Sequence, residues 1–383
     1  MSPFSSDDAK SWLPSPQELK NCYPLSKDLK AFIEKSRQEI KNILLERDHR
    51  LILIVGPCSI HDLEACREYA SYLKDLIEEV SDQFFILMRV YFEKPRTLTG
   101  WKGFVTDPHL DGSYDIAKGL QLTRQFLWEL ASQKIPIATE LLEIMTTPYV
   151  DDLLSWGCIG ARTCTSPLHR QMAAGLPFPV GFKNSTDGNI TNAINGVIVA
   201  SAPHAFMGVD EKGMLKRISV PGNPNCHLIL RGGKFESNYD LASIQKALIE
   251  LSAAGQSRRL IVDCSHDNCG KIYERQMPIF YSLIDLIQKG HREIKGMMLE
   301  SHLFEGNQTL SHPSQLRYGV SVTDPCLDWE RTQRMIHQAY KQLQNTLPKQ
   351  SCLVYAPHSR THQGQQSDRP KCGAASERSL LSQ

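Results

Sequence analysis

Short, continuously apolar segments recur through most of this chain and constrain its fold more than any other feature. The eight segments are LILIV (51–55), FFILM (84–88), PIAT (136–139), CIGA (158–161), PVGF (179–182), HLIL (227–230), LIVDC (260–264) and KGMML (295–299). A strand that is apolar without alternation is buried on both faces, as in a parallel sheet covered by helices. The pattern therefore predicts a parallel sheet inside the protein.

Amphipathic stripes at helical spacing lie between several of these segments. Three of them cover residues 63–80, 244–251 and 279–287. Strand–helix repetition through eight strands is typical of an α/β chain that closes into a (β/α)8 TIM barrel, and we expect that fold. An open doubly wound sheet is the alternative, but no G-x-G-x-x-G turn follows the first apolar segment.

The barrel is expected to occupy residues 51–346. Within it, HAFMGV (204–209) and RISV (217–220) flank the turn residues DEKG. This arrangement predicts a β-hairpin at about 204–220, inserted between the fifth and sixth barrel strands.

Both ends of the chain lie outside the predicted barrel. Residues 1–50 are expected to form a helical extension for regulation and oligomerisation, in which Ser26 caps a helix with apolar residues from Leu29 to Leu44. Residues 347–383 are rich in Ser, Gln, His, Arg and Gly and have no periodicity. We expect this tail to be disordered.

The charge of the chain excludes some classes of partner. Lys and Arg number 43 and Asp and Glu 42, a formal net charge of +1. Sequence-independent nucleic-acid binding and membrane-surface binding need a clear cationic excess, so neither is expected. No apolar run approaches the ~20 residues of a membrane span. The absence of a signal-like start and the eleven scattered cysteines predict a cytoplasmic protein.

Each predicted strand ends in a charged or metal-competent residue. In a TIM barrel the chemistry gathers at the C-terminal ends of the strands. These positions are Cys58, Arg89, Glu140, Arg162, Lys183, Arg231, His266 and Glu300. One such residue alone would be read as a solvated loop charge, but eight together predict a functional barrel mouth.

Six cations are expected to converge on that mouth. They are Arg89, Lys94, Arg96, Arg162, Lys183 and Arg231. Arginine binds oxyanions through a planar fork and lysine adds a point charge, so the set predicts a site for phosphate and carboxylate groups. Six exceed what one phosphate needs, which indicates two anionic substrates or a phosphate and a carboxylate.

Four further residues are candidate metal ligands: Cys58, His266, Glu300 and Asp324. A thiolate, an imidazole and two carboxylates suit one divalent ion such as Mn, Fe, Co or Zn better than Mg or Ca. The spacing carries no H-x-x-x-H or C-x-x-C signature. A structural Cys58 and a hydrogen-bonded His266 are the alternative interpretation.

Several long motifs resemble one known family. They are GPCSIHD (56–62), RVYFEKPRT (89–97), GWKG (100–103), GART (160–163), PVGFKN (179–184), ILRGGK (229–234), DCSH (263–266) and EGNQ (305–308). In these motifs, from about residue 12 to 346, the chain resembles the class I 3-deoxy-D-arabino-heptulosonate-7-phosphate (DAHP) synthases. The loop KPRT distinguishes it from the related 3-deoxy-octulosonate-8-phosphate synthases.

The resemblance implies a reaction and a role for each candidate residue. Phosphoenolpyruvate and erythrose 4-phosphate would condense to DAHP and phosphate at the start of the shikimate pathway, with Cys58, His266, Glu300 and Asp324 holding the metal. The phosphoenolpyruvate pocket maps onto Arg89, Lys94, Glu140, Arg162, Lys183 and Arg231, and the erythrose 4-phosphate site onto Pro95, Arg96, Thr97 and Asp324. Lys94, Glu140, Cys58 and His266 are the expected catalytic set, and a homodimer or homotetramer is the expected assembly.

Sensitive members of this family bind an aromatic amino acid between the N-terminal extension and the inserted hairpin. The matching cavity residues are Ile144, Pro148, Leu176, Pro177, Phe206 and Gly208. Gly208 resembles the tyrosine-inhibited type, so tyrosine is the expected effector.

Three departures from the family pattern motivate a competing hypothesis. Ser185 stands where glycine is usual and the backbone is expected to favour it, and Thr165 and Asp267 are also atypical. They motivate a degenerate paralogue that binds effector or a partner without turnover. A sister synthase acting on arabinose 5-phosphate and a Schiff-base aldolase using Lys183 are two further hypotheses.

Overall fold

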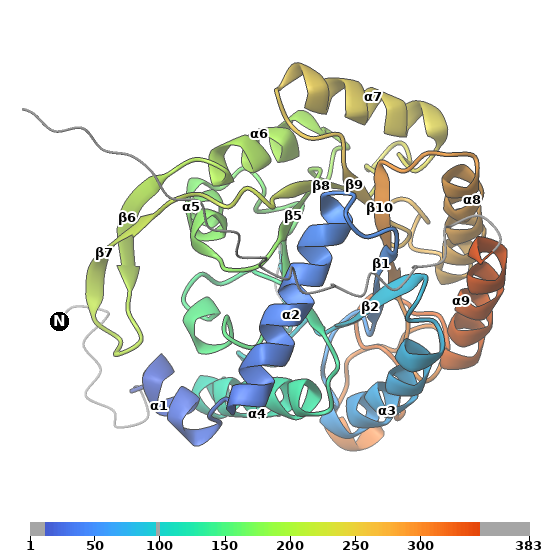
Figure 1. Cartoon of the computed structure of the whole chain (residues 1–383). Helices are drawn as coiled ribbons and strands as arrows, with labels where there is room; N and C mark the ends of the chain where they lie inside the picture. The colour runs from blue at the N-terminus through green and yellow to red at the C-terminus, as the bar shows by residue number, and fades with distance from the viewer. Residues whose placement is uncertain (1–11, 97–99, 345–383) are drawn as a thin grey trace, which may run out of the picture. The chain divides into compact units, whose positions relative to one another are not determined.

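Eight parallel strands close into a barrel in the computed structural model, which describes residues 12–96 and 100–344 (Figure 1). Around the barrel the order is β1-β10-β9-β8-β5-β4-β3-β2. The strands are β1 (Leu51–Gly56), β2 (Phe84–Arg89), β3 (Ile137–Glu140), β4 (Trp156–Ile159), β5 (Val180–Lys183), β8 (His227–Leu230), β9 (Leu260–Asp263) and β10 (Ile294–Glu300). All eight predicted strands are confirmed, and β4 begins two residues earlier than expected.

The helices alternate with the strands and cover the outside of the barrel. They are α3 (Leu63–Glu79), α4 (Ile116–Ser132), α5 (Pro167–Gly175), α6 (Thr191–Ala200), α7 (Leu241–Ala253), α8 (Gln276–Gln288) and α9 (Trp329–Leu343). The three predicted stripes lie in α3, α7 and α8. Side-chain oxygens of Asp62, Asp240 and Asp328 cap α3, α7 and α9 by accepting backbone N–H groups.

Two helices precede the barrel. Ser26 caps α2 (Lys27–Leu44) by accepting from the N–H of Leu29, as predicted. Ile40, Ile43 and Leu44 of α2 join the core cluster formed inside the barrel, and Figure 1 shows α2 lying across it. The short helix α1 (Pro16–Cys22) was not predicted, although Ser15 and Glu18 form a capping box at its start.

The inserted hairpin is present where it was predicted. Strands β6 (His204–Val209) and β7 (Leu215–Val220) pair antiparallel between α6 and β8. Near the hairpin turn, the carbonyl of Glu211 accepts a 2.7 Å hydrogen bond from the N–H of Gln17 in α1. The hairpin is therefore tied to the N-terminal extension.

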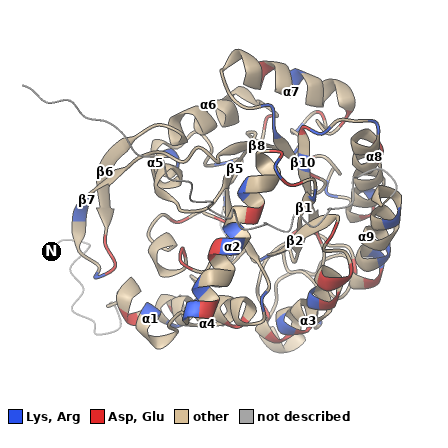
Figure 2. Ribbon diagram, in the orientation of Figure 1, with Lys and Arg blue, Asp and Glu red and all other residues tan. Residues whose placement is uncertain are grey.

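Charges of both signs are interspersed on the outer helices, for example along α2 and α3 (Figure 2). No helix of the described residues is long and apolar enough to cross a membrane. The predicted disordered tail, 347–383, lies outside the described residues.

Candidate functional site

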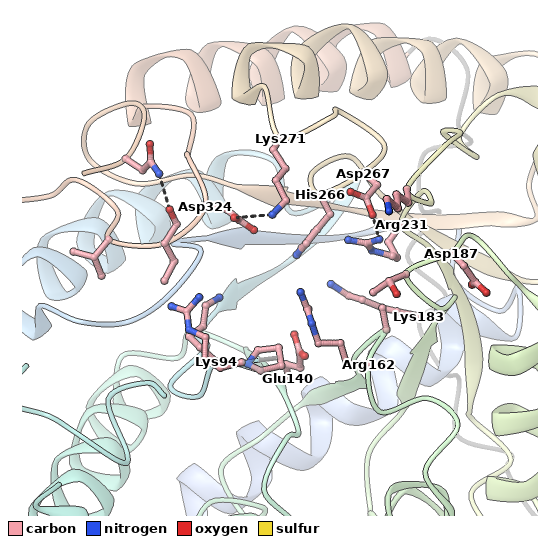
Figure 3. A pocket seen from close by; sticks show the side chains of 18 of the residues that line it. Lys94, Glu140, Arg162, Lys183, Asp187, Arg231, His266, Asp267, Lys271 and Asp324 are labelled. Atoms are coloured by element: carbon pink, nitrogen blue, oxygen red, sulfur yellow. Dashed lines mark hydrogen bonds and ion pairs between the residues drawn. The ribbon is translucent and has the colours of Figure 1, made fainter. Parts of the chain in front are cut away.

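A pocket of about 740 Å³ opens at the C-terminal ends of the barrel strands (Figure 3). Seven Lys or Arg residues and four Asp or Glu residues line it, so its wall carries three more positive than negative charges. The cations are Lys94, Arg96, Arg162, Lys183, Arg231, Lys234 and Lys271, and the acids are Glu140, Asp187, Asp267 and Asp324. The near-neutral chain therefore has a local anion-attracting cavity.

Most of the residues predicted for the site line this pocket. They are Lys94, Pro95, Arg96, Glu140, Arg162, Lys183, Arg231, His266 and Asp324. Cys58, Arg89 and Glu300 lie below its floor and are 0%, 1% and 2% exposed. Thr97 lies outside the described residues. Sequence reasoning missed Lys234 and Lys271, because they come three and five residues after a strand-end position rather than at it.

The four candidate metal ligands converge at the floor of the pocket. Ligand atoms of Cys58, Glu300 and Asp324 lie within 4.8 Å of one another. His266 presents Nε2 to this cluster, 3.8 Å from Glu300 Oε1. The imidazole reaches this position from a left-handed backbone conformation, with φ of 56°.

The surroundings of His266 fix its tautomer. Its Nδ1 lies 2.9 Å from the Asp263 carboxylate, and because a carboxylate only accepts, Nδ1 carries the proton. Although burial opposes ionisation, Lys183 and His266 hold the pKa of Asp263 well below its usual range. Nε2 therefore keeps its lone pair toward the cluster, the orientation that a metal-binding histidine needs.

The donor set fits a divalent first-row ion. Burial raises the pKa of the Cys58 thiol, but Lys94 Nζ lies 3.2 Å from its sulfur and stabilises a thiolate. Burial also opposes ionisation of Asp324, yet His266 and Lys271 lower its pKa overall. One sulfur, one nitrogen and two carboxylates match the preferences of Mn, Fe, Co or Zn.

Buried cations underlie the anion-binding wall. Arg89 donates from Nη2 to Glu300 Oε1 at 2.8 Å and from Nε to the carbonyl of Pro57 at 3.1 Å. Lys183 donates to Asp263 at 2.9 Å. Because Arg89 is outside the pocket lining, its direct contact with a substrate remains a prediction.

Tyr91 is buried outside the pocket lining but contacts three of the predicted site cations, and sequence reasoning missed it. The Arg89 guanidinium lies 3.5 Å from the centroid of its ring, and the ammonium groups of Lys94 and Lys183 lie 5.9 Å away. The negative face of an aromatic ring attracts cations, so one buried ring stabilises three like charges. An aromatic residue just after a buried strand is read as core, which is why the sequence offered no signal.

Burial lowers the pKa of Lys183, but Asp263 opposes this and raises it overall. A Schiff-base lysine must instead lose its proton near neutral pH. The ion pair therefore argues against Lys183 as a nucleophile.

Gly160, which follows β4, makes room for Glu140. A Cβ atom at position 160 would lie 2.1 Å from Glu140 Oε1. The glycine of the GART motif thus lets the Glu140 carboxylate lie across the backbone of the neighbouring strand end.

The three sequence departures have different structural consequences. The Ser185 backbone is not left-handed, and its hydroxyl donates to Asp187 Oδ1 at 2.6 Å, so the expectation that this position favours glycine was wrong. Thr165 is exposed. Asp267 forms an ion pair with Arg231 in the pocket wall (Figure 3).

The six predicted effector residues lie apart from the mouth pocket. Ile144 and Pro148 follow β3, Leu176 and Pro177 follow α5, and Phe206 and Gly208 are on β6. These elements are neighbours, since the Thr147 hydroxyl of the 3-10 helix η2 (Thr147–Tyr149) donates to the Met172 sulfur of α5 at 3.2 Å, and α5 packs against β6. A Cβ at Gly208 would meet Ile218 Cδ1 at 2.4 Å. The effector cavity itself remains a prediction.

Comparison with known proteins places the chain in a family. Residues 28–337 match the model of the DAHP synthetase I family. The chain is 47% identical over 336 residues to the Tyr-sensitive phospho-2-dehydro-3-deoxyheptonate aldolase of Escherichia coli (strain K12), over 88% of this chain and 94% of that protein. It is 43% identical over 331 residues to the Phe-sensitive protein of the same organism, over 86% and 94%. The solved phospho-2-dehydro-3-deoxyheptonate aldolase of Francisella tularensis SCHU S4 is similar with a TM-score of 0.85 and 40% identity, over 88% of this chain and 99% of that one. The chain therefore belongs to the DAHP synthetase I family.

Proposed function

We propose that this protein condenses phosphoenolpyruvate with erythrose 4-phosphate and water to give DAHP and phosphate, the first step of the shikimate pathway. The observation that carries the proposal is the cationic pocket of about 740 Å³ with a Cys58, Glu300 and Asp324 cluster at its floor. Two phosphorylated substrates need both the volume and the surplus of positive charge. The family membership supports the same reaction.

The substrates are assigned to neighbouring parts of the pocket. Phosphoenolpyruvate would be bound by Lys94, Glu140, Arg162, Lys183 and Arg231, with Arg89 supporting the site from below. Erythrose 4-phosphate would be bound by Pro95, Arg96 and Thr97, with Asp324 near its aldehyde end. Lys94 also contacts the metal cluster, because its ammonium donates to the Cys58 carbonyl at 2.8 Å and lies 3.2 Å from the Cys58 sulfur.

The side chains divide the chemistry between binding and proton transfer. Cys58, His266, Glu300 and Asp324 would hold a divalent ion, which would supply Lewis acidity for the attack on the aldehyde. Fixed cations neutralise the phosphate and carboxylate charges as C3 of phosphoenolpyruvate attacks the aldehyde carbon. Water then adds at C2 and phosphate leaves. Glu140 borders the pocket and is our candidate for handling the proton of that water.

Metal dependence can be tested by phosphate release from the two substrates. We expect chelation to abolish release and Mn, Fe or Co to restore it. Cys58→Ser should lose at least about a hundredfold in activity, since removing even a residue that only orients a metal ligand typically costs about 10- to 100-fold. Cys22→Ser is the control, because Cys22 is an exposed thiol in α1. Full activity in chelator would overturn the metal assignment.

Substrate choice and regulation can be read in the same assay. Replacing erythrose 4-phosphate by arabinose 5-phosphate should abolish turnover; the opposite preference would identify a sister synthase. Complete inactivity with both aldoses and added metal would favour the degenerate paralogue. Tyrosine should inhibit more strongly than phenylalanine or tryptophan.

We also infer that the protein is cytoplasmic and forms a homodimer or homotetramer. Light scattering can test the assembly by its molar mass.

A further inference from the structure

Asp267 forms an ion pair with Arg231, one of the arginines that line the pocket. Its Oδ2 contacts Nη1 of Arg231, and Figure 3 shows the two side chains facing each other across the wall. Arg231 is 6% exposed at its side chain and Asp267 is 24% exposed. A carboxylate and a phosphate bind the guanidinium group through the same N–H donors.

The backbone holds Asp267 in this position. The N–H of Asn268 donates to the Arg231 carbonyl at 3.2 Å, and the Asn268 amide donates to the carbonyls of Asp263 and Leu230 at 2.8 and 3.3 Å. A Cβ at Gly232 would lie 2.6 Å from the carbonyl carbon of Asp267, so the two strand-end loops are in close contact. The ion pair is thus built into the fold and differs from a pair between two mobile surface chains.

The other three carboxylates of the pocket, Glu140, Asp187 and Asp324, form no ion pair with an arginine of the described residues. Asp187 accepts from the Ser185 hydroxyl at 2.6 Å and from the N–H of Asn189 at 3.0 Å. Asp324 lies in the metal cluster and 3.5 Å from Lys271. Asp267 is therefore the carboxylate placed to occupy an arginine of the anion-binding wall.

We propose that Asp267 competes with the substrate phosphate for Arg231 and thereby sets the affinity of the site for phosphoenolpyruvate. In the substrate-free protein Asp267 neutralises the arginine. When phosphate arrives, the carboxylate gives up its contact with Nη1, and part of the binding free energy is lost to breaking the ion pair. The proposal rests on the function proposed above, in which Arg231 binds phosphoenolpyruvate.

The test compares two isosteric variants, Asp267→Asn and Asp187→Asn. Both remove one negative charge from the same pocket, but only the first removes the ion pair with Arg231. Calorimetric titration with inorganic phosphate should give a dissociation constant five- to twentyfold lower for Asp267→Asn than for the wild type. Asp187→Asn should change it by less than about threefold.

Steady-state kinetics supply the second measurement. For Asp267→Asn we expect the KM for phosphoenolpyruvate to fall by a similar factor, with no rise in kcat and little change in the KM for erythrose 4-phosphate. A loss of affinity would mean that Asp267 holds Arg231 in place and would overturn the proposal. Equal changes in phosphate affinity for the two variants would mean that only the net charge of the pocket matters, and this result would also overturn the proposal.

The two proposals fail in different ways. If the wild-type protein releases no phosphate from the two substrates, the proposed function fails, and the phosphate titration still shows whether Asp267 competes at Arg231. If the wild type is active and Asp267→Asn resembles Asp187→Asn, the function stands and the competition is excluded.

Discussion

Glu93, at the residue scale, links two loops of the barrel mouth. Its carboxylate accepts from the Thr146 hydroxyl at 2.9 Å and from the N–H of Glu143 at 3.3 Å. Burial raises the pKa of Glu93 to about 7, and the hydrogen bonds oppose that shift only in part. The next residue is Lys94, so this carboxylate anchors the loop that carries Lys94.

The raised pKa of Glu93 predicts a dependence of stability on pH. Between its unfolded value of 4.5 and about 7, the native protein binds a proton that the unfolded chain lacks. The contribution of Glu93 to the free energy of unfolding therefore falls as pH rises through this window, by up to about 3 kcal/mol. Glu93→Gln removes this titration. The free energy of unfolding of the variant minus that of the wild type should therefore be larger at pH 8 than at pH 5.

Urea unfolding of both proteins at pH 5 and pH 8 measures this difference. Glu330→Gln serves as a control, because Glu330 forms only an exposed pair with Arg334 among its ion pairs to described residues. If Glu93→Gln changes the free energy of unfolding equally at both pH values, burial does not raise the pKa of Glu93.

At the scale of elements, one buried arginine fastens the N-terminal extension to the barrel. Arg124 on α4 is 0% exposed and donates to the carbonyls of Leu19 and Tyr23, at 3.1 and 3.2 Å. It also donates to the Tyr149 carbonyl at 2.7 Å and, through both Nη atoms, to the Asp152 carboxylate at 2.8 and 2.9 Å. Helix α1 is thereby linked to the segment that follows η2.

Replacing this arginine should release α1. Arg124→Leu removes the guanidinium donor from the Asp152 carboxylate and from three carbonyls, and breaking a buried pair from one side costs about 3–5 kcal/mol. We expect hydrogen exchange to accelerate at residues 16–23 before it does in the barrel strands. Arg334→Leu, which removes an exposed pair, should change stability by less than about 0.5 kcal/mol. Unchanged protection of α1 in Arg124→Leu would contradict this role.

At the scale of the whole molecule, the barrel brings together ligands that are far apart in sequence. Cys58 and Asp324 are 266 positions apart, yet their ligand atoms lie within 4.8 Å. A metal ion that binds only the folded chain stabilises it, by about 2.7 kcal/mol at a hundredfold excess over its dissociation constant. We expect Mn, Fe or Co to raise the unfolding temperature of chelated protein by several degrees.

The metal-induced shift, rather than stability itself, is the readout. Cys58→Ser should reduce it strongly even if the variant is less stable, and Cys22→Ser should keep it. An equal shift in Cys58→Ser would place the ion elsewhere.

The strands and their end residues were predictable because they depend on local chemistry. Continuous apolarity marks a strand buried on both faces, and a parallel barrel sends all its C-terminal strand ends to one mouth. Glu140, Lys183, Arg231 and His266 therefore line the pocket as expected. The capping of α2 by Ser26 was predictable for the same local reason.

The sequence by itself thus determined the barrel, the inserted hairpin and the residue types at its mouth. Only the tertiary structure decided which side chains pair there: Arg89 with Glu300 below the floor, the three cations around Tyr91, and Asp267 with Arg231. These pairings depend on how loops of different length return across the strand ends. Periodicity does not encode that geometry, because backbone dihedrals and long-range packing set it in the folded chain.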